Sequence, residues 1–279
     1  MQPADARRPF LSAIACGSGT TAGCRVEWSP SSLPDVAIMP TKIEKLEAHA
    51  SHLLDIFIGL REKFAMLEPM LFDETVVRAN GSGAQHRGFH ILRHSLFLSC
   101  AQDIAKLCYD RDERTPSIHK LVESLGDTHL RKALEDRYAA FVSPSIEDET
   151  DPEIVEALRV WERKEQAELR AQFLALHQEL VDTWATLSVA ASTKAFHTIR
   201  DKVSAHTEVR HVVDKYQLID IGALGIKWRD VGSTIQSMQR LVEIIGMVIR
   251  GASFAWDALD HSLNKAAVGF WSAPESKAP

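Results

Sequence analysis

Near the end of the chain an arginine, a carboxylate and a histidine lie close together in sequence. Arg200 and Asp201 are adjacent, and five residues separate Arg200 from His206. A guanidinium stays charged, and its planar fork can donate two hydrogen bonds to one phosphate. An imidazole, with an ordinary pKa of about 6.5, can take up or release a proton near neutral pH. The segment therefore has the kinds of group that cleave a phosphodiester: a cation for the developing charge and a residue for proton transfer.

The spacing of these residues limits what one copy of the segment can do. On a continuous helix, six residues turn by about 600° and rise by about 9 Å, which leaves Arg200 and His206 about 120° apart. One histidine also supplies only one of the two proton transfers that cleavage at a ribose 2′-hydroxyl needs. Two copies that meet at a twofold axis would bring two arginines and two histidines into one cleft. We therefore expect a homodimer in which Arg200 binds the scissile phosphate and His206 is general base in one subunit and general acid in the other.

Other polar residues in the same segment extend this hypothesis. Asp201 is expected to orient Arg200 or to accept a hydrogen bond from the ribose. Ser204 follows Arg200 by one turn on nearly the same helix face, where it could contact the phosphate. Three further side chains make the segment locally basic and are expected to contact RNA: His197, Lys202 and Arg210. Because the formal net charge of the chain is −6, RNA would have to bind at such a local patch.

The run Ile199 to Lys202, followed by Ala205 and His206, resembles the signature of the HEPN superfamily. In that signature an arginine and a histidine lie four to six residues apart, and a polar residue follows the arginine. The run is most similar to the abortive-infection U-type (AbiU2-like) branch. The resemblance implies an all-α, HEPN-like antiparallel bundle that cleaves RNA without a metal or another cofactor, at a site shared by two subunits.

The resemblance also implies a biological role and the chemistry of the products. It favours a toxin-like growth arrest or phage defence function, and it leaves open whether an antitoxin or regulatory partner exists. Some antitoxin-paired relatives carry a tyrosine two positions after the histidine, where this chain has Glu208. Attack by the 2′-hydroxyl predicts 2′,3′-cyclic phosphate and 5′-hydroxyl ends.

Two rival hypotheses belong to different functional classes. His86, His90 and His94 recur every four residues on one helix face, a spacing that could bind a metal in a helical-bundle hydrolase. The bundle could instead be a non-catalytic RNA- or protein-binding module that binds its partner through the helix at residues 151–189. Trp161 and Trp184 fall on the apolar face of that helix and are expected in the core rather than in base stacking.

Bulk properties indicate a cytoplasmic protein with no membrane span. No apolar run approaches the roughly 18 residues that cross a bilayer. The four cysteines form no close metal-binding pair and no dense disulfide framework, so we expect free thiols in a reducing compartment. The sequence contains no Gly-rich phosphate loop and no nucleophile elbow, which disfavours the phosphate-loop and dinucleotide-binding classes.

Hydrophobic periodicity predicts long helices with short helical insertions between them. Thr41 and Glu44 form a capping-box pattern at the first helix, and Asp151-Pro152 is a start signal for the longest one. The expected helices cover residues 41–72, 84–110, 117–124, 126–141, 151–189, 192–209 and 231–266, and residues 216–227 are expected to be a loop. Strand signals are nearly absent.

The same patterns suggest three parts of the chain. Residues 1–40 lack sustained periodicity and are predicted to be a disordered leader, with Met39 as a hypothetical natural start. Residues 41–268 are predicted to form the helical domain. Residues 269–279 are predicted to be a flexible tail.

Overall fold

The computed structural model describes most of the chain from Thr41 onward. The described residues are 41–143, 146, 149–204, 209–212, 215–218 and 221–272, and at 204, 209–212, 215–218 and 223 only the backbone is described. The predicted leader at residues 1–40, Met39 included, lies outside these ranges. So does most of the predicted tail, so both stay predictions.

Helix α1 (Lys42–Phe72) is central to the core, and its start follows from the sequence. The Thr41 hydroxyl accepts from the backbone N–H of Glu44 at 3.2 Å, and the Glu44 carboxylate accepts from the backbone N–H of Thr41 at 2.6 Å. This is the predicted capping box. Buried side chains then recur at steps of three and four from Leu46 to Leu67, which gives α1 one continuous apolar stripe.

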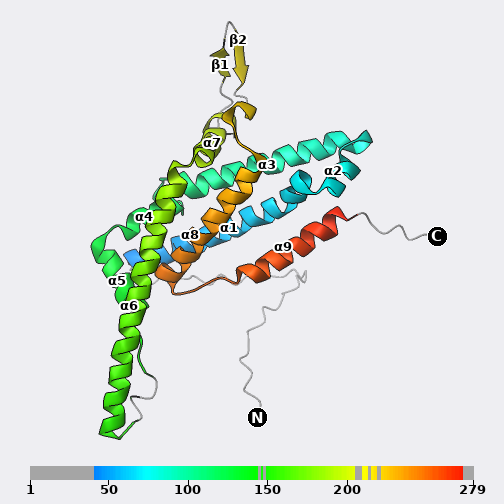
Figure 1. Cartoon of the computed structure of the whole chain (residues 1–279). Coiled ribbons are helices and arrows are strands. Elements are labelled where there is room, and N and C mark those ends of the chain that lie inside the picture. The colour runs from blue at the N-terminus through cyan, green and yellow to red at the C-terminus, as the bar shows by residue number, and fades with distance from the viewer. Residues whose placement is uncertain are drawn as a thin grey trace, which may run out of the picture. The chain divides into compact units, whose positions relative to one another are not determined.

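The remaining helices pack on that stripe or beside it (Figure 1). In chain order they are α2 (Glu74–Asn80), α3 (His86–Tyr109), α4 (Ile118–Leu125), α5 (Thr128–Tyr138), α6 (Pro152–Val189), α7 (Ala191–Ile199), α8 (Trp228–Arg250) and α9 (Trp256–Trp271), with 3₁₀ turns η1 (Gly83–Gln85) and η3 (Gly222–Leu224). Helix α1 packs against α3, α8 and α9, and α6 packs against α8. The predicted all-α antiparallel bundle is confirmed.

The core lies where these helices meet. Phe57 on α1, Ile104 on α3 and Phe173 on α6 are all fully buried. Burial of each such side chain contributes about 1.5–3 kcal/mol. None of the helices in the described part of the chain is both long and apolar enough to cross a membrane.

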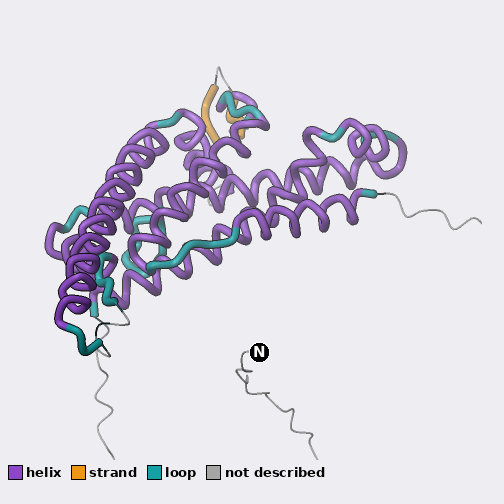
Figure 2. Tube along the Cα trace, turned by 60° about the horizontal axis from the view of Figure 1, so that its bottom comes forward, coloured by secondary structure: helices purple, strands orange, loops and turns teal. Residues whose placement is uncertain are grey.

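Helix α6 contributes to the core only through its second half. Its buried residues run from Phe173 to Leu187, after the N-cap of Asp151 and the predicted Pro152 start. In the first half Trp161 is 43% exposed, which corrects the prediction that it lies in the core. Trp161 instead packs edge-on against Phe141, with ring centroids 5.1 Å apart. Figures 1 and 2 show this half of α6 extending beyond the other helices.

Besides the short helix α2, which was not predicted, the chain departs from the predicted helices in two places. The helix expected at 192–209 is α-helical only to Ile199 and continues as a π-helical turn, η2 (Arg200–Ser204). Beyond it, β1 (Val209–Val212) pairs antiparallel with β2 (Lys215–Leu218), with Val209 opposite Leu218. The hairpin replaces helix at Val209 and part of the expected loop. Strand β1 begins and ends with a β-branched valine, and β2 alternates polar with aromatic or apolar residues, both of which favour strand.

The expected single helix at 231–266 is also two helices, α8 and α9. Gly251 has φ +63°, in the left-handed region that ends a helix. The N–H of Ala252 donates to the carbonyl of Gly246 at 3.3 Å and that of Gly251 to Met247 at 3.1 Å. These two bonds close the end of α8, so α9 starts in a new direction.

Candidate active site

The signature residues lie where α7 ends against α3. Phe196 and Ile199 of α7 are fully buried, and α7 packs on α3. The π-helical turn η2 begins at the next residue, Arg200. Such turns are rare and frequently occur at functional sites. Because the α-helix ends at Ile199, the 120° angle predicted for a continuous helix between Arg200 and His206 does not apply.

Arg200 is held by a residue that the sequence analysis did not identify. Its Nη2 donates to Oδ2 of Asp110 at 3.5 Å, with side-chain exposures of 33% for Arg200 and 16% for Asp110. Asp110 ends α3, and its Oδ1 accepts from the backbone N–H of Asp112 at 3.1 Å. Its carbonyl accepts from the hydroxyl of Ser117, the buried N-cap of α4. The guanidinium is therefore anchored to the junction of α3 and α4.

Asp201 contacts a different residue from the one expected. Its Oδ2 lies 3.0 Å from Nδ1 of His197, an ion pair when the imidazole is protonated, and both side chains are about two-fifths exposed. The His197 ring also packs edge-on against Tyr109, with centroids 5.1 Å apart. The Tyr109 hydroxyl donates to the carbonyl of Ser188 at 2.6 Å, and burial raises the pKa of this phenol. Residues from α3 and η2 thus contact the imidazole on α7, and Tyr109 links them to α6.

The other predicted site residues are placed less completely. His206 lies outside the described residues, so its approach to Arg200 stays a prediction. Ser204 and Arg210 are described by their backbone alone, at the end of η2 and in β1. Lys202 lies in η2 with a half-buried side chain. Of the predicted set, the structure therefore pairs Asp201 with His197, joins Arg200 to Asp110 instead, and leaves the other residues open.

The histidines of the metal hypothesis lie on the first half of α3. His86 contacts the carbonyl of Gly81 through Nδ1 at 2.5 Å, and Nδ1 of His90 lies 2.8 Å from Nη2 of Arg93. Burial, Arg93 and His86 all lower the pKa of His90. In the described ranges no three His, Cys, Asp or Glu side chains converge as metal ligands. The predicted set of His86, His90 and His94 is therefore not assembled as a metal site.

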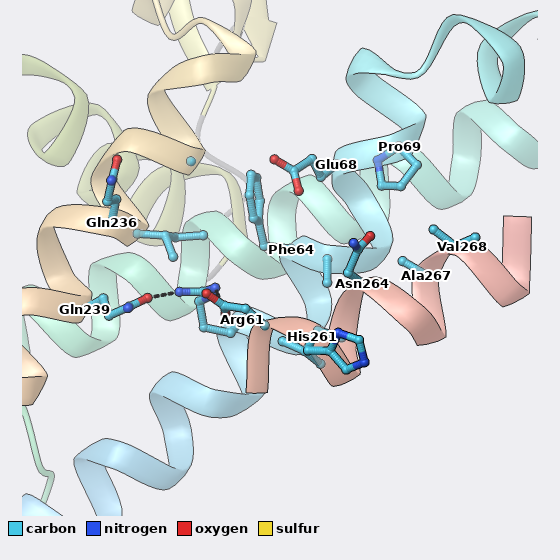
Figure 3. Close-up of a pocket in the computed structure, with 15 residues that line it drawn as sticks. Arg61, Phe64, Glu68, Pro69, Gln236, Gln239, His261, Asn264, Ala267 and Val268 are labelled. Carbon is cyan, nitrogen blue, oxygen red and sulfur yellow. Dashed lines mark hydrogen bonds and ion pairs between the residues drawn. The ribbon is translucent and has the colours of Figure 1, made fainter. Parts of the chain in front are cut away.

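A large cleft in the described region is separate from the signature. It has a volume of about 670 Å³ and lies between α1, α8 and α9 (Figure 3). Arg61 donates to Gln239 of α8 and to Asp260 of α9, so the guanidinium links all three helices. The signature residues are absent from its lining. Since Arg61 is already paired with the carboxylate of Asp260, the cleft offers little attraction for an anionic ligand.

Sequence reasoning missed Asp110 and Tyr109 for a simple reason. They precede Arg200 by about ninety residues, and nothing in the local pattern links the two segments. The only available signal was the polar run from Asp110 to Arg114 directly after an apolar helix, which indicates a helix end but no partner. The pairing follows only once α7 is packed on α3.

The fold and the signature define the class of protein. A helical bundle that presents an arginine and a following carboxylate at the end of a packed helix is the arrangement expected of a HEPN protein. The HEPN family model described as AbiU2 matches residues 43–270, well over half of the chain. The chain therefore belongs to the AbiU2 family of HEPN proteins, as the signature predicted. Searches of curated proteins and of solved structures find no match.

Proposed function

We propose that this protein is a metal-independent endoribonuclease that uses Arg200 and His206. The observation that carries the proposal is the placement of Arg200 in a chain of the HEPN family. Its guanidinium is one-third exposed, yet it is paired with the carboxylate of Asp110. A cation that is both positioned and accessible is what stabilisation of a phosphoryl transition state requires.

The reaction follows from the chemistry of these groups. His206 takes the proton from a ribose 2′-hydroxyl, and the oxygen attacks the adjacent phosphorus. Arg200 donates to the phosphoryl oxygens, on which negative charge increases. A second imidazole protonates the leaving 5′-oxygen, and the hypothesis from sequence assigns this step to His206 of a second subunit. Cleavage leaves a 2′,3′-cyclic phosphate and a 5′-hydroxyl.

Growth arrest in phage defence is the biological role that this activity supports. Cleavage of cellular RNA would halt the host cell, in keeping with the abortive-infection branch that the signature resembles. Expression of the wild-type protein should arrest growth, whereas His206→Ala should not. Control variants at exposed residues far from the signature, His52→Ala and Arg163→Ala, should arrest growth like the wild type.

The biochemical test uses purified protein, labelled RNA and a chelator. Wild-type protein should cleave with the chelator present, and Arg200→Ala and His206→Ala should each lose about 10²-fold or more in rate. If the site is shared by two subunits and uses both His206 imidazoles, a mixed dimer of wild-type and His206→Ala subunits should be inactive, so an excess of His206→Ala protein should lower the wild-type rate. Full activity of either variant alone would contradict the proposal.

A second candidate function is supported by the exposed half of α6. Ile154 is 46%, Val160 53% and Trp161 43% exposed on this half, which extends past the bundle. Exposed apolar side chains in a group can mark a protein-binding surface. In this case the protein is a non-catalytic binding module. It is favoured if His206→Ala keeps cellular activity while replacement of the three apolar residues by serine abolishes it.

A further inference from the structure

The first half of α3 carries positive charge in a chain that is acidic overall. Residues 75–102 contain no Asp or Glu, although the whole chain has 38 of these residues and a formal net charge of −6. Within this range, α3 holds Arg87, Arg93 and the three histidines of the metal hypothesis. This half of the helix therefore presents cations that have no acidic neighbours in sequence.

A row of contacts joins these side chains to an exposed tryptophan at the start of α8. The rings of His86 and His90 lie 4.1 Å apart, and Nδ1 of His90 lies 2.8 Å from Nη2 of Arg93. The Arg93 guanidinium lies over the indole of Trp228, 5.8 Å from the ring centre. Trp228 also packs edge-on against Phe97 at 5.1 Å, so the start of α8 lies against α3 (Figure 1).

Three further cations border this row. Lys227 and Arg229 lie on either side of the tryptophan in sequence, and Arg87 lies in the first turn of α3; all three are exposed. In the part of the chain that the structure describes, none of them forms an ion pair, and neither does the arginine over the indole. The adjacent carboxylate of Asp230 accepts instead from the backbone N–H of Lys227 at 2.8 Å. The group is named here the α3–α8 patch and consists of Arg87, Arg93, Lys227, Trp228 and Arg229.

The positive surroundings also affect the titration of a neighbouring imidazole. Burial lowers the pKa of His90, and the charges of Arg93 and His86 lower it further. Surroundings that disfavour a positive charge on this ring favour a negative charge on a ligand.

Trp228 adds a flat aromatic surface to this charge. It is 43% exposed, and rings on which bases stack, beside cations that bind phosphates, make up the surfaces that bind single-stranded nucleic acid. Trp161 provides the contrast within this chain. It is equally exposed, but its indole N–H donates to the carboxylate of Glu165 at 3.0 Å. The charge around Trp228, rather than its exposure, therefore indicates an anionic ligand.

An anionic membrane surface is the rival ligand, because Ile91 and Leu92 of α3 are 58% and 40% exposed. Apolar side chains that enter a membrane lie on one face of a helix. Ile91 is two positions before Arg93, so it lies about 160° away around the helix from the residue that covers the indole. The geometry therefore favours RNA over lipid.

We propose that the α3–α8 patch is a binding site for single-stranded RNA, with Trp228 stacked on a base and the cations of the patch paired with phosphates. The 13 residues from Phe97 to Asp110 rise by about 20 Å along α3, so the patch is separate from the anchor of Arg200. A strand of several nucleotides spans this distance. The inference goes beyond the proposed function, because binding at the patch does not require cleavage.

The test measures binding of a labelled 2′-O-methyl oligonucleotide, which lacks the 2′-hydroxyl that cleavage needs. Fluorescence anisotropy is recorded over a range of salt concentrations. Trp228→Ala should weaken binding by about 5- to 100-fold and keep the salt dependence, because it removes stacking but no phosphate contact. Arg87→Gln/Arg229→Gln should reduce the slope of log K against log salt by about 0.7 for each cation removed.

Matched variants separate stacking and charge from loss of structure. Trp228→Phe keeps an aromatic ring against Phe97 and should retain most of the affinity. Trp161→Ala and Arg163→Gln change an equally exposed tryptophan and an exposed arginine on α6, and both should keep the wild-type affinity and slope. Trp228→Ala should not weaken binding of a duplex, because the bases of a duplex are already stacked.

Two outcomes would overturn the inference. The first is wild-type affinity and salt slope in both Trp228→Ala and Arg87→Gln/Arg229→Gln. The second is no binding of the single strand by the wild-type protein, with or without binding of phosphatidylserine vesicles that Trp228→Ala abolishes.

Binding and cleavage also separate this inference from the proposed function. If the wild type cleaves RNA but the patch variants bind the 2′-O-methyl strand normally, the patch inference fails and the proposed function stands. If the patch variants lose binding but the wild type does not cleave RNA, the proposed function fails and the patch inference stands.

Discussion

The pairing of Arg200 with Asp110 should be measurable as a coupling energy. At 3.5 Å and an effective dielectric constant of about 20, two unit charges attract by about 5 kcal/mol. Solvent reaches one-third of the arginine, and burial of both groups costs solvation. Exposed pairs contribute up to about 1 kcal/mol, whereas removal of one partner from a fully buried pair costs about 3–5 kcal/mol. We therefore expect a coupling of about 1–2 kcal/mol for this intermediate case.

A double-mutant cycle with Asp110→Asn and Arg200→Gln isolates this term. Asparagine keeps an oxygen that can accept from the backbone N–H of Asp112, so the end of α3 is preserved. The free energy of unfolding in urea is measured for the wild type, both single variants and the double variant. The double variant should be less destabilised than the sum of the single ones by the coupling energy.

The same cycle on Asp112 and Arg114 is the control. These residues form a shorter contact of 3.1 Å, but their side chains are 45% and 89% exposed. Their coupling should be too small to measure, because water screens the pair. If the Asp110–Arg200 coupling is no larger than the control, then Asp110 does not hold the guanidinium and the account of the site is wrong.

Three further predictions concern the rest of the fold. Gly251 has a positive φ, so Gly251→Ala should destabilise the protein by about 1 kcal/mol in urea unfolding. Gly59 lies in α1 with no atom within 4 Å of an added Cβ, so Gly59→Ala should stabilise the protein by about 0.5–1 kcal/mol. The same sign for both variants would contradict the backbone assignment. Burial, helped by Lys45 and Arg131 respectively, lowers the pKa of His49 and His177 below 6.5. As the pH falls, these histidines are therefore protonated in the unfolded chain before they are protonated in the folded one, so the free energy of unfolding should fall below pH 6.5. The fall should be smaller in the His49→Gln/His177→Gln variant. Burial raises the pKa of the Cys100 and Cys108 thiols to about 12, so few thiolates form in the folded protein. In a Cys16→Ser/Cys24→Ser variant, which keeps only these two thiols, a thiol reagent should react only after unfolding. Rapid labelling of the native variant would contradict this.

Local patterns were enough to predict most of the helices. The start of α1 depends on Thr41 and Glu44, and that of α6 on Asp151 and Pro152, and these signals act within one helical turn. Core positions on α1 follow from the same periodicity. The signature itself was visible because it is contiguous, and the family match agrees with it.

What sequence could not predict depends on packing between distant segments or on weak local preferences. The π-helical turn at Arg200 has no distinct sequence pattern, so helix was expected to continue. The break at Gly251 was not predicted, and residues 231–266 were expected to form one helix. Asp110 and Tyr109 became part of the site only through the contact of α3 with α7.

The most direct test of the central claim is the chemistry of the RNA ends. A short RNA is incubated with the wild-type protein and a chelator, and its products are weighed by mass spectrometry. Cleavage by Arg200 and His206 predicts 2′,3′-cyclic phosphate and 5′-hydroxyl ends, absent with His206→Ala. Products with 5′-phosphate ends, or cleavage that stops when the chelator is added, would contradict the claim.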